Sequence, residues 1–266
     1  MLCHVESISG YMVESLTSIP YCNENSLRII RELKMVKHSK KSTLNICAYC
    51  GTLSYTTPDH IPPKNLFPKP WKNLISVPAC KVCHANTSKD DEYFRLKILM
   101  REDVLSNPGA RIAWKVALRS LTKTEATGLR KKVVLDLTNV EMRTQSGLYV
   151  GTRPGYNVDM NRIRSVLQRI VRGLYFRETG NVLGLNTKVH LYMDDDFIEL
   201  PSHTRDEIQP VILYLASLPP ITIGENIFLY RYHIAKKDST VSAWGLSFYG
   251  KFPFLAMTGP STPKPV

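Results

Sequence analysis

The sequence predicts an α+β protein in which a small cysteine-containing domain precedes a domain of helix and antiparallel sheet. Three observations predict this fold. Two C-x-x-C pairs stand early in the chain, one strongly amphipathic helix follows in the middle, and four segments rich in aromatic and β-branched residues come after it. With 266 residues, 43% of them hydrophobic, the chain can bury the core that such a fold needs.

The two ends of the chain carry weaker signals. Residues 1–40 are expected to form a basic, flexible leader with one short helix over 26–35, and translation starting at Met35 instead of Met1 remains an alternative. The polar, Pro-rich tail 259–266 is expected to be disordered. Neither a signal peptide nor an apolar run long enough for a membrane span is found, so we expect a cytoplasmic protein without membrane contact.

The first predicted domain comprises residues 41–105. It contains the two C-x-x-C pairs, a Pro-rich loop and a run, DDEYFRLKILMRE, whose apolar positions predict a helix over 89–103. Asn107-Pro108-Gly109 then ends that helix.

The second predicted domain comprises residues 106–258. It is expected to begin with a helix over 110–120 and short strands at KKVVLDL (131–137) and GLYVG (147–151). Apolar residues at i, i+3, i+4, i+7, i+8 and i+11 predict a helix over 161–177 with Asp159 as its N-cap. The segments 188–193, 226–235, 241–250 and 252–257 predict a largely antiparallel sheet whose aromatic residues, including Trp244 and Tyr249, form core.

The charge of the chain indicates a polyanionic partner. Lys and Arg number 35 against 23 Asp and Glu, which gives a net charge of +12. Nucleic acid is the leading candidate because basic side chains bind phosphates with release of counterions, although an acidic membrane surface or plain solubility would explain the same charge.

The four cysteines of the C-x-x-C pairs predict a structural metal site. Cys47 and Cys50 form one pair, Cys80 and Cys83 the other, and four thiolates in two such pairs supply a closed tetrahedral site for Zn²⁺. Disulfides are disfavoured by the expected compartment. Cys3 and Cys22 have no such partner in the sequence.

Polar residues with metal-binding and acid–base chemistry stand between and just after the two pairs. Asp59-His60 is followed by Asn73-Leu74, and His84 comes directly after Cys83. A carboxylate, imidazoles and a further polar group held by a zinc-stapled core suit phosphodiester hydrolysis, in which a metal ion neutralises developing charge and a base activates water.

The order C-x-x-C, D-H-I-x-P, N-L and C-x-x-C-H resembles the zinc-containing branch of the HNH endonuclease family. The segments DHIPPKNLFPKP and SKDDEYF also resemble uncharacterised bacterial HNH proteins. The resemblance covers about a fifth of the chain. It implies a ββα-metal domain, in which a two-stranded hairpin and a helix hold a catalytic ion between them.

The resemblance assigns a role to each matching residue. Asp59 would bind the catalytic Mg²⁺ or other divalent ion, and His60 would be the general base. Asn73 would brace the loop of the ββα unit, and His84 would be the second ligand of the catalytic ion. The family often continues C-H/N-x-x-K, whereas here the lysine is shifted to Lys89, which leaves Lys89 as a candidate phosphate contact and Asn86 as a candidate auxiliary ligand.

Each of these residues also has a purely structural interpretation. Asp59 can cap a turn after Pro58, His60 can be a buried core histidine, and His84 can be a zinc ligand or an exposed residue next to the second C-x-x-C pair. The arginines of the 161–177 helix can be a solvated face or a phosphate track. They are Arg162, Arg164, Arg169, Arg172 and Arg177.

The sequence therefore predicts a DNA endonuclease that uses one catalytic ion, with zinc in a structural role only. Two alternatives stay open: an RNA-cleaving toxin or defence effector, and a non-catalytic zinc-ribbon module that binds nucleic acid. A homodimer, which would place two active sites on opposite strands, is a further possibility that the sequence leaves open.

Overall fold

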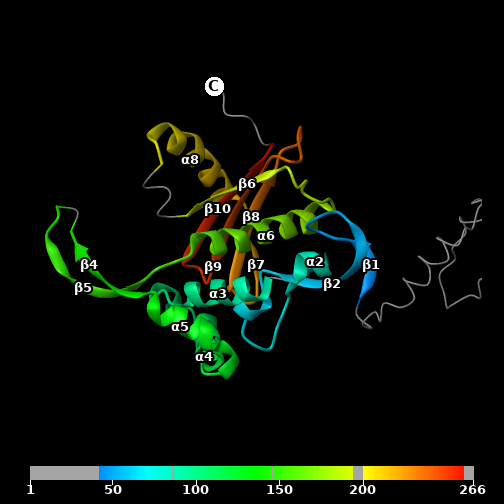
Figure 1. Cartoon of the computed structure of the whole chain (residues 1–266). Helices are drawn as coiled ribbons and strands as arrows, with labels where there is room; N and C mark the ends of the chain where they lie inside the picture. Colours follow the sequence, from blue (N-terminus) through cyan, green and yellow to red (C-terminus); the bar gives the residue numbers. More distant parts are fainter. Residues whose placement is uncertain (1–41, 86, 145, 194–199, 261–266) are drawn as a thin grey trace, which may run out of the picture. The chain divides into compact units, whose positions relative to one another are not determined.

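The computed structural model describes residues 42–85, 87–144, 146–193 and 200–260 (Figure 1). Apart from Ser42, these residues belong to one compact unit, Thr43–Val266, which contains helices and three antiparallel sheets, so the predicted α+β class is confirmed. The predicted leader 1–40 with its helix over 26–35, Asn86 and tail residues 261–266 lie outside the described residues. Among the described helices, none is long and apolar enough to cross a membrane.

The first sheet carries the sequence motif. Its strands are β1 (Thr43–Ile46), β2 (Leu53–Ile61) and β3 (Ile75–Cys80), in the order β1-β2-β3. β2 and β3 pair antiparallel with Asp59 opposite Val77 and His60 opposite Ser76. The chain then forms the short helix α2 (Lys81–His84) and the longer α3 (Thr87–Leu99), which ends before the predicted 89–103 limit.

Two helices follow α3. Asn107 caps α4 (Pro108–Leu121) by accepting hydrogen bonds from the backbone N–H groups of Gly109 and Ala110. α5 (Thr127–Leu135) occupies most of the segment KKVVLDL, so the predicted strand 131–137 is wrong. Leu129 and Val133, four residues apart on one face of α5, pack against the core, and this packing favours a helix over a strand.

A two-stranded ribbon comes next, formed by β4 (Leu137–Arg143) and β5 (Tyr149–Tyr156). Every residue of β4 is exposed. The base of the ribbon is fixed to α3 by the buried Lys97, whose ammonium donates to Asp136 at 2.9 Å and to the carbonyl of Asn157 at 2.7 Å.

The predicted central helix is present as α6 (Met160–Thr179). Asp159 caps it by accepting from the N–H of Arg162, as predicted, and Gly180 ends it with a left-handed backbone (φ 71°). The predicted apolar face is buried.

The C-terminal sheet has five antiparallel strands in the order β6-β10-β9-β8-β7, and four of them were predicted. They are β6 (Lys188–Met193), β7 (Ile221–Ile223), β8 (Phe228–Ile234), β9 (Ser242–Phe248) and β10 (Phe252–Gly259). Trp244 and Tyr249 are buried, as expected. One face of the sheet joins the core formed with α3 and α6, and α8 (Ser202–Ser217), which was not predicted, packs on the other.

The main core is continuous across both predicted domains. It joins Cys47 and Tyr93 from the segment 41–105 with Val171, Trp244 and Phe248 from the segment 106–258. α3 packs along α6, and Phe94 meets Phe248 edge to face. The C-terminal part thus forms the support on which the motif-bearing sheet rests.

Candidate functional site

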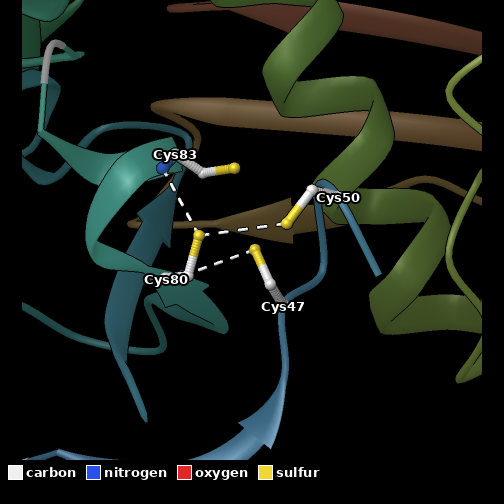
Figure 2. A group of neighbouring side chains, drawn as sticks. All are labelled: Cys47, Cys50, Cys80 and Cys83. Carbon is white, nitrogen blue, oxygen red and sulfur yellow. Dashed lines mark hydrogen bonds between the residues drawn. The ribbon is translucent and has the colours of Figure 1, made fainter. Parts of the chain in front are cut away.

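The four predicted zinc ligands lie together (Figure 2). Cys47 and Cys50 stand in the turn between β1 and β2, Cys80 ends β3, and Cys83 lies in α2. Their sulfur atoms all lie within 4.8 Å of one another, and none forms a disulfide. The group can therefore hold a metal ion such as zinc.

The local backbone explains why these cysteines converge. Gly51, with φ 74°, closes the first turn, in which its N–H donates to the carbonyl of Cys47. The N–H groups of Cys80 and Cys83 point at the sulfurs of Cys47 and Cys80, at 3.4 and 3.5 Å. Burial raises the pKa of Cys50, but hydrogen bonds with Thr52, Cys47 and Cys83 together lower it to about 6, whereas burial raises the pKa of Cys47 and of Cys83. A metal ion would have to bind these cysteines as thiolates.

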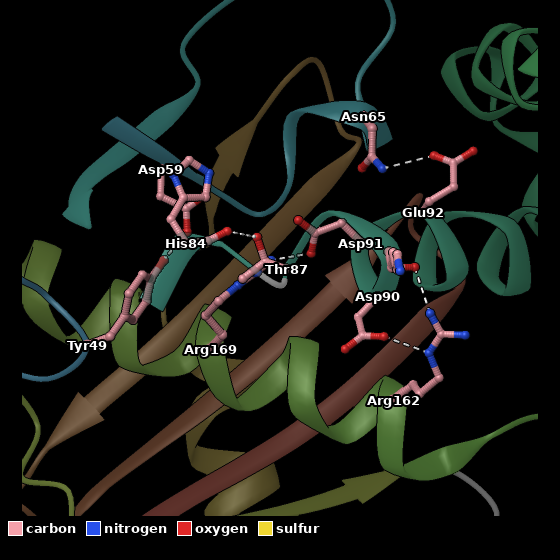
Figure 3. A network of polar contacts seen from close by, with 11 residues as sticks. Tyr49, Asp59, Asn65, His84, Thr87, Asp90, Asp91, Glu92, Arg162 and Arg169 are labelled. Carbon is pink, nitrogen blue, oxygen red and sulfur yellow. Dashed lines mark hydrogen bonds and ion pairs between the residues drawn. The ribbon is translucent and has the colours of Figure 1, made fainter. Parts of the chain in front are cut away.

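A second polar group lies beside the cysteines, where β2 and α2 bring Asp59 and His84 together (Figure 3). His84 Nε2 lies 3.6 Å from Asp59 Oδ1. Asp59 is 6% exposed and accepts a hydrogen bond of 2.7 Å from the hydroxyl of Tyr49. Thr57 Oγ1 lies 3.2 Å from the other imidazole nitrogen of His84, so the ring is held with Nε2 toward the carboxylate.

The other two residues of the predicted motif do not join this contact. His60 follows Asp59 on β2, and adjacent strand residues point to opposite faces of a sheet. Its Nδ1 is buried and has no hydrogen-bond partner within the described part of the chain. Asn73 is exposed in the loop between β2 and β3 with a left-handed backbone (φ 53°). Their predicted roles stay predictions.

An ion pair that the sequence did not predict lies next to Asp59. Asp91 of α3 pairs with Arg169 of α6, and both side chains are largely buried. Burial raises the pKa of Asp91 to about 6, and the nearby Asp59 adds to this effect while Arg169 opposes it. Burial and the charge of Asp59 also raise the pKa of Tyr49. The acidic run SKDDEYF was the one sequence signal for this ion pair.

Three of the arginines of α6, Arg162, Arg169 and Arg172, have partners inside the protein. Arg162 pairs with Asp90 at 2.6 Å (Figure 3). It also donates to the carbonyl of Lys89. Arg172 donates to the carbonyls of residues 183, 184 and 187 at 2.8–3.1 Å. Arg164 is half-buried and Lys89 exposed. Packing thus accounts for Arg162, Arg169 and Arg172, and the phosphate track stays a prediction.

The arrangement of Asp59 and His84 suits a divalent cation. A carboxylate oxygen and an imidazole nitrogen 3.6 Å apart can both reach one ion, and each is oriented by a further hydrogen bond, from Tyr49 and with Thr57. The side chain of His84 is 40% exposed, so an ion here would be open to solvent and to a substrate.

Comparison with other proteins supplies no relative from which a function could be transferred. No protein family, no protein of curated function and no solved structure matches this chain. The functional argument therefore rests on the four cysteines, on the pair formed by Asp59 and His84, and on the residues around them.

Proposed function

We propose that this protein is a metal-dependent endonuclease of the HNH type that hydrolyses phosphodiester bonds in DNA. The observation that carries the proposal is the approach of His84 Nε2 to within 3.6 Å of Asp59 Oδ1 beside the cysteine cluster. These are the two residues to which the family resemblance assigns the catalytic ion.

The order of elements around this pair supports the proposal. β2 and β3 form an antiparallel hairpin, and α2 and α3 follow directly, which is the order of a ββα-metal unit. The cysteine cluster ties the turn before β2 to the start of α2. A metal in this cluster would fix the positions of Asp59 and His84 relative to each other, and such preorganisation matters for catalysis.

Each side chain at the site has its own role in the proposed reaction. Asp59 and His84 would hold Mg²⁺ or a similar ion, which supplies charge neutralisation at the scissile phosphate. Tyr49 and Thr57 keep these two ligands oriented. The family resemblance assigns the general base to His60. Adjacent residues of β2 point to opposite faces of the sheet, so the position of Asp59 does not by itself support this role, and the variant His60→Ala tests it directly.

The charge of the chain agrees with a nucleic-acid substrate. A net charge of +12 attracts a polyanion over the distance set by ionic screening. The same charge serves DNA and RNA, so the substrates used in the test include both.

The decisive experiment is cleavage of supercoiled plasmid with Mg²⁺, Mn²⁺ or Ni²⁺, compared with buffer lacking divalent ions. His60→Ala is the test variant, and His190→Ala, an exposed histidine on β6, is the matched control. We expect metal-dependent nicking by the wild type and by His190→Ala, and its loss in His60→Ala with unchanged melting temperature.

Two results would contradict the proposal. Full cleavage by purified His60→Ala would refute the assigned mechanism. Absence of cleavage of plasmid and of single-stranded DNA with every ion would refute the DNA nuclease, and a parallel RNA substrate would then show whether the same site acts on RNA.

A further inference from the structure

The loop that joins β2 to β3, residues 62–74, starts two residues after His60 and presents an exposed tryptophan. Trp71 is 46% exposed, whereas Trp244 is fully buried and Trp114 half-buried. The loop begins and ends at the strand positions beside the site, because Ile61 pairs with Ile75 and His60 with Ser76. Trp71 stands five residues before Ser76, the residue opposite His60.

The exposed part of this loop stands on a fixed base. Leu66 and Phe67 are buried, and the carbonyl of Leu66 accepts a hydrogen bond of 2.7 Å from Tyr249. Phe67 packs so closely on Gly224 that a Cβ there would lie 2.4 Å from its ring. A loop held in this way can present an aromatic side chain without a large loss of conformational entropy on binding.

Two lysines lie over the indole ring. Lys64 Nζ lies 5.4 Å and Lys69 Nζ 4.9 Å from its ring centroid, and Lys72 pairs with Glu225 at 2.8 Å. Among the described residues, no carboxylate forms an ion pair with Lys64 or Lys69. Ammonium groups on flexible stems that lie over an exposed ring can turn away to phosphates, which uncovers the ring for another planar group.

We propose that Trp71 stacks on an unpaired nucleobase while Lys64 and Lys69 contact the flanking phosphates, so that single-stranded or locally unpaired nucleic acid is the preferred substrate class. This inference rests on the proposed function and narrows its substrate. Every base offers a flat face to an indole, but in a duplex those faces are covered by neighbouring base pairs. An aromatic residue flanked by lysines is a common platform for single strands.

The test measures binding in the absence of divalent ions, in a His60→Ala background that cannot cleave. Tryptophan fluorescence and anisotropy are recorded with oligo(dT), oligo(rU) and a blunt DNA duplex. The variants are Trp71→Ala and Trp71→Phe, and the matched control is Tyr214→Ala, since Tyr214 is also 46% exposed but lies on α8.

We expect Trp71→Ala to weaken binding of the single strand about tenfold, from the usual contribution of one base stacked on an aromatic ring. Duplex binding should change less than about twofold, and Trp71→Phe should retain most of the affinity but lose the fluorescence quenching. Lys69→Gln should lower the dependence of affinity on salt by about one phosphate contact. The two oligonucleotides show whether the unpaired base belongs to DNA or RNA.

Equal affinity of the wild type and Trp71→Ala for single strands, or equal losses on single strands and duplex, would overturn the inference. Plasmid cleavage by the protein with His60 intact is scored separately. Retained cleavage with no Trp71 effect refutes the stacking platform alone, and a Trp71 effect without cleavage refutes the nuclease alone.

Discussion

His84 Nε2 lies 3.6 Å from Asp59 Oδ1, although the imidazole comes from α2 and the carboxylate from β2. The two side chains differ in exposure: the carboxylate is 7% exposed and the imidazole 40%. A charged group as buried as Asp59 needs compensation, which Tyr49 supplies in part through its hydrogen bond. The remaining oxygen faces the imidazole, and this is where a cation would be most favourable.

Asp59→Asn tests this pair with the least change of shape. The amide keeps an acceptor for Tyr49 but loses the charge that attracts a cation, so we expect metal-dependent cleavage to fall at least about 100-fold with little change in melting temperature. The rate of plasmid nicking and calorimetric titration with Mn²⁺ measure the two effects. Undiminished cleavage by Asp59→Asn would remove Asp59 from the catalytic ion.

The cysteine cluster predicts one tightly bound zinc per chain. Native mass spectrometry should show it in the wild type and not in Cys80→Ser, whereas Cys22→Ser, which lies outside the two C-x-x-C pairs, should retain it. Since metal binding is coupled to folding, we expect Cys80→Ser to lower the melting temperature by roughly 10 °C or more. A fully stable, zinc-free wild type would contradict a structural role for the metal.

Because of Asp91, the free energy of unfolding should fall as the pH rises. Its pKa is raised from 3.8 to about 6, so its favourable contribution is complete below about pH 4 and is lost as the pH rises through 6. Without added divalent ions, the unfolding free energy of the wild type should fall by up to about 3 kcal/mol relative to Asp91→Asn across this window. Urea titrations from pH 4 to 7 measure it; parallel curves for the two proteins would show that Asp91 titrates normally.

The elements that the sequence predicted are those with a strong local signal. α6 has a continuous apolar face and an N-cap at Asp159, and the strands of the C-terminal sheet are aromatic and β-branched. The sequence did not predict α8. Pro210 lies inside this helix and only Ile208 and Leu215 are buried in it, so it has hardly any apolar face. The segment KKVVLDL is too short for its periodicity to distinguish a strand from a helix. It is helical because it packs against the core in that form.

The candidate site likewise contains features that the sequence predicted and features that it did not. The spacing of the cysteines predicted their convergence, because each C-x-x-C pair is a local structure and four thiolates share one preferred partner. The pair formed by Asp91 and Arg169 could not be predicted in this way. It depends on α3 lying along α6, and such tertiary packing brings together residues that are far apart in the sequence without leaving a local pattern.

Variants of Arg172 can show whether an arginine of α6 stabilises the fold or contacts phosphate. Its guanidinium donates to three backbone carbonyls, and burial lowers its pKa, so we expect Arg172→Gln to reduce the unfolding free energy by about 3 kcal/mol. Arg177→Gln, an exposed position on the same helix, should change it by less than about 0.5 kcal/mol. Urea unfolding measures both variants, and titration of an oligonucleotide at several salt concentrations measures their phosphate contacts. A normal stability of Arg172→Gln combined with a weaker salt dependence would instead show that this arginine contacts phosphate.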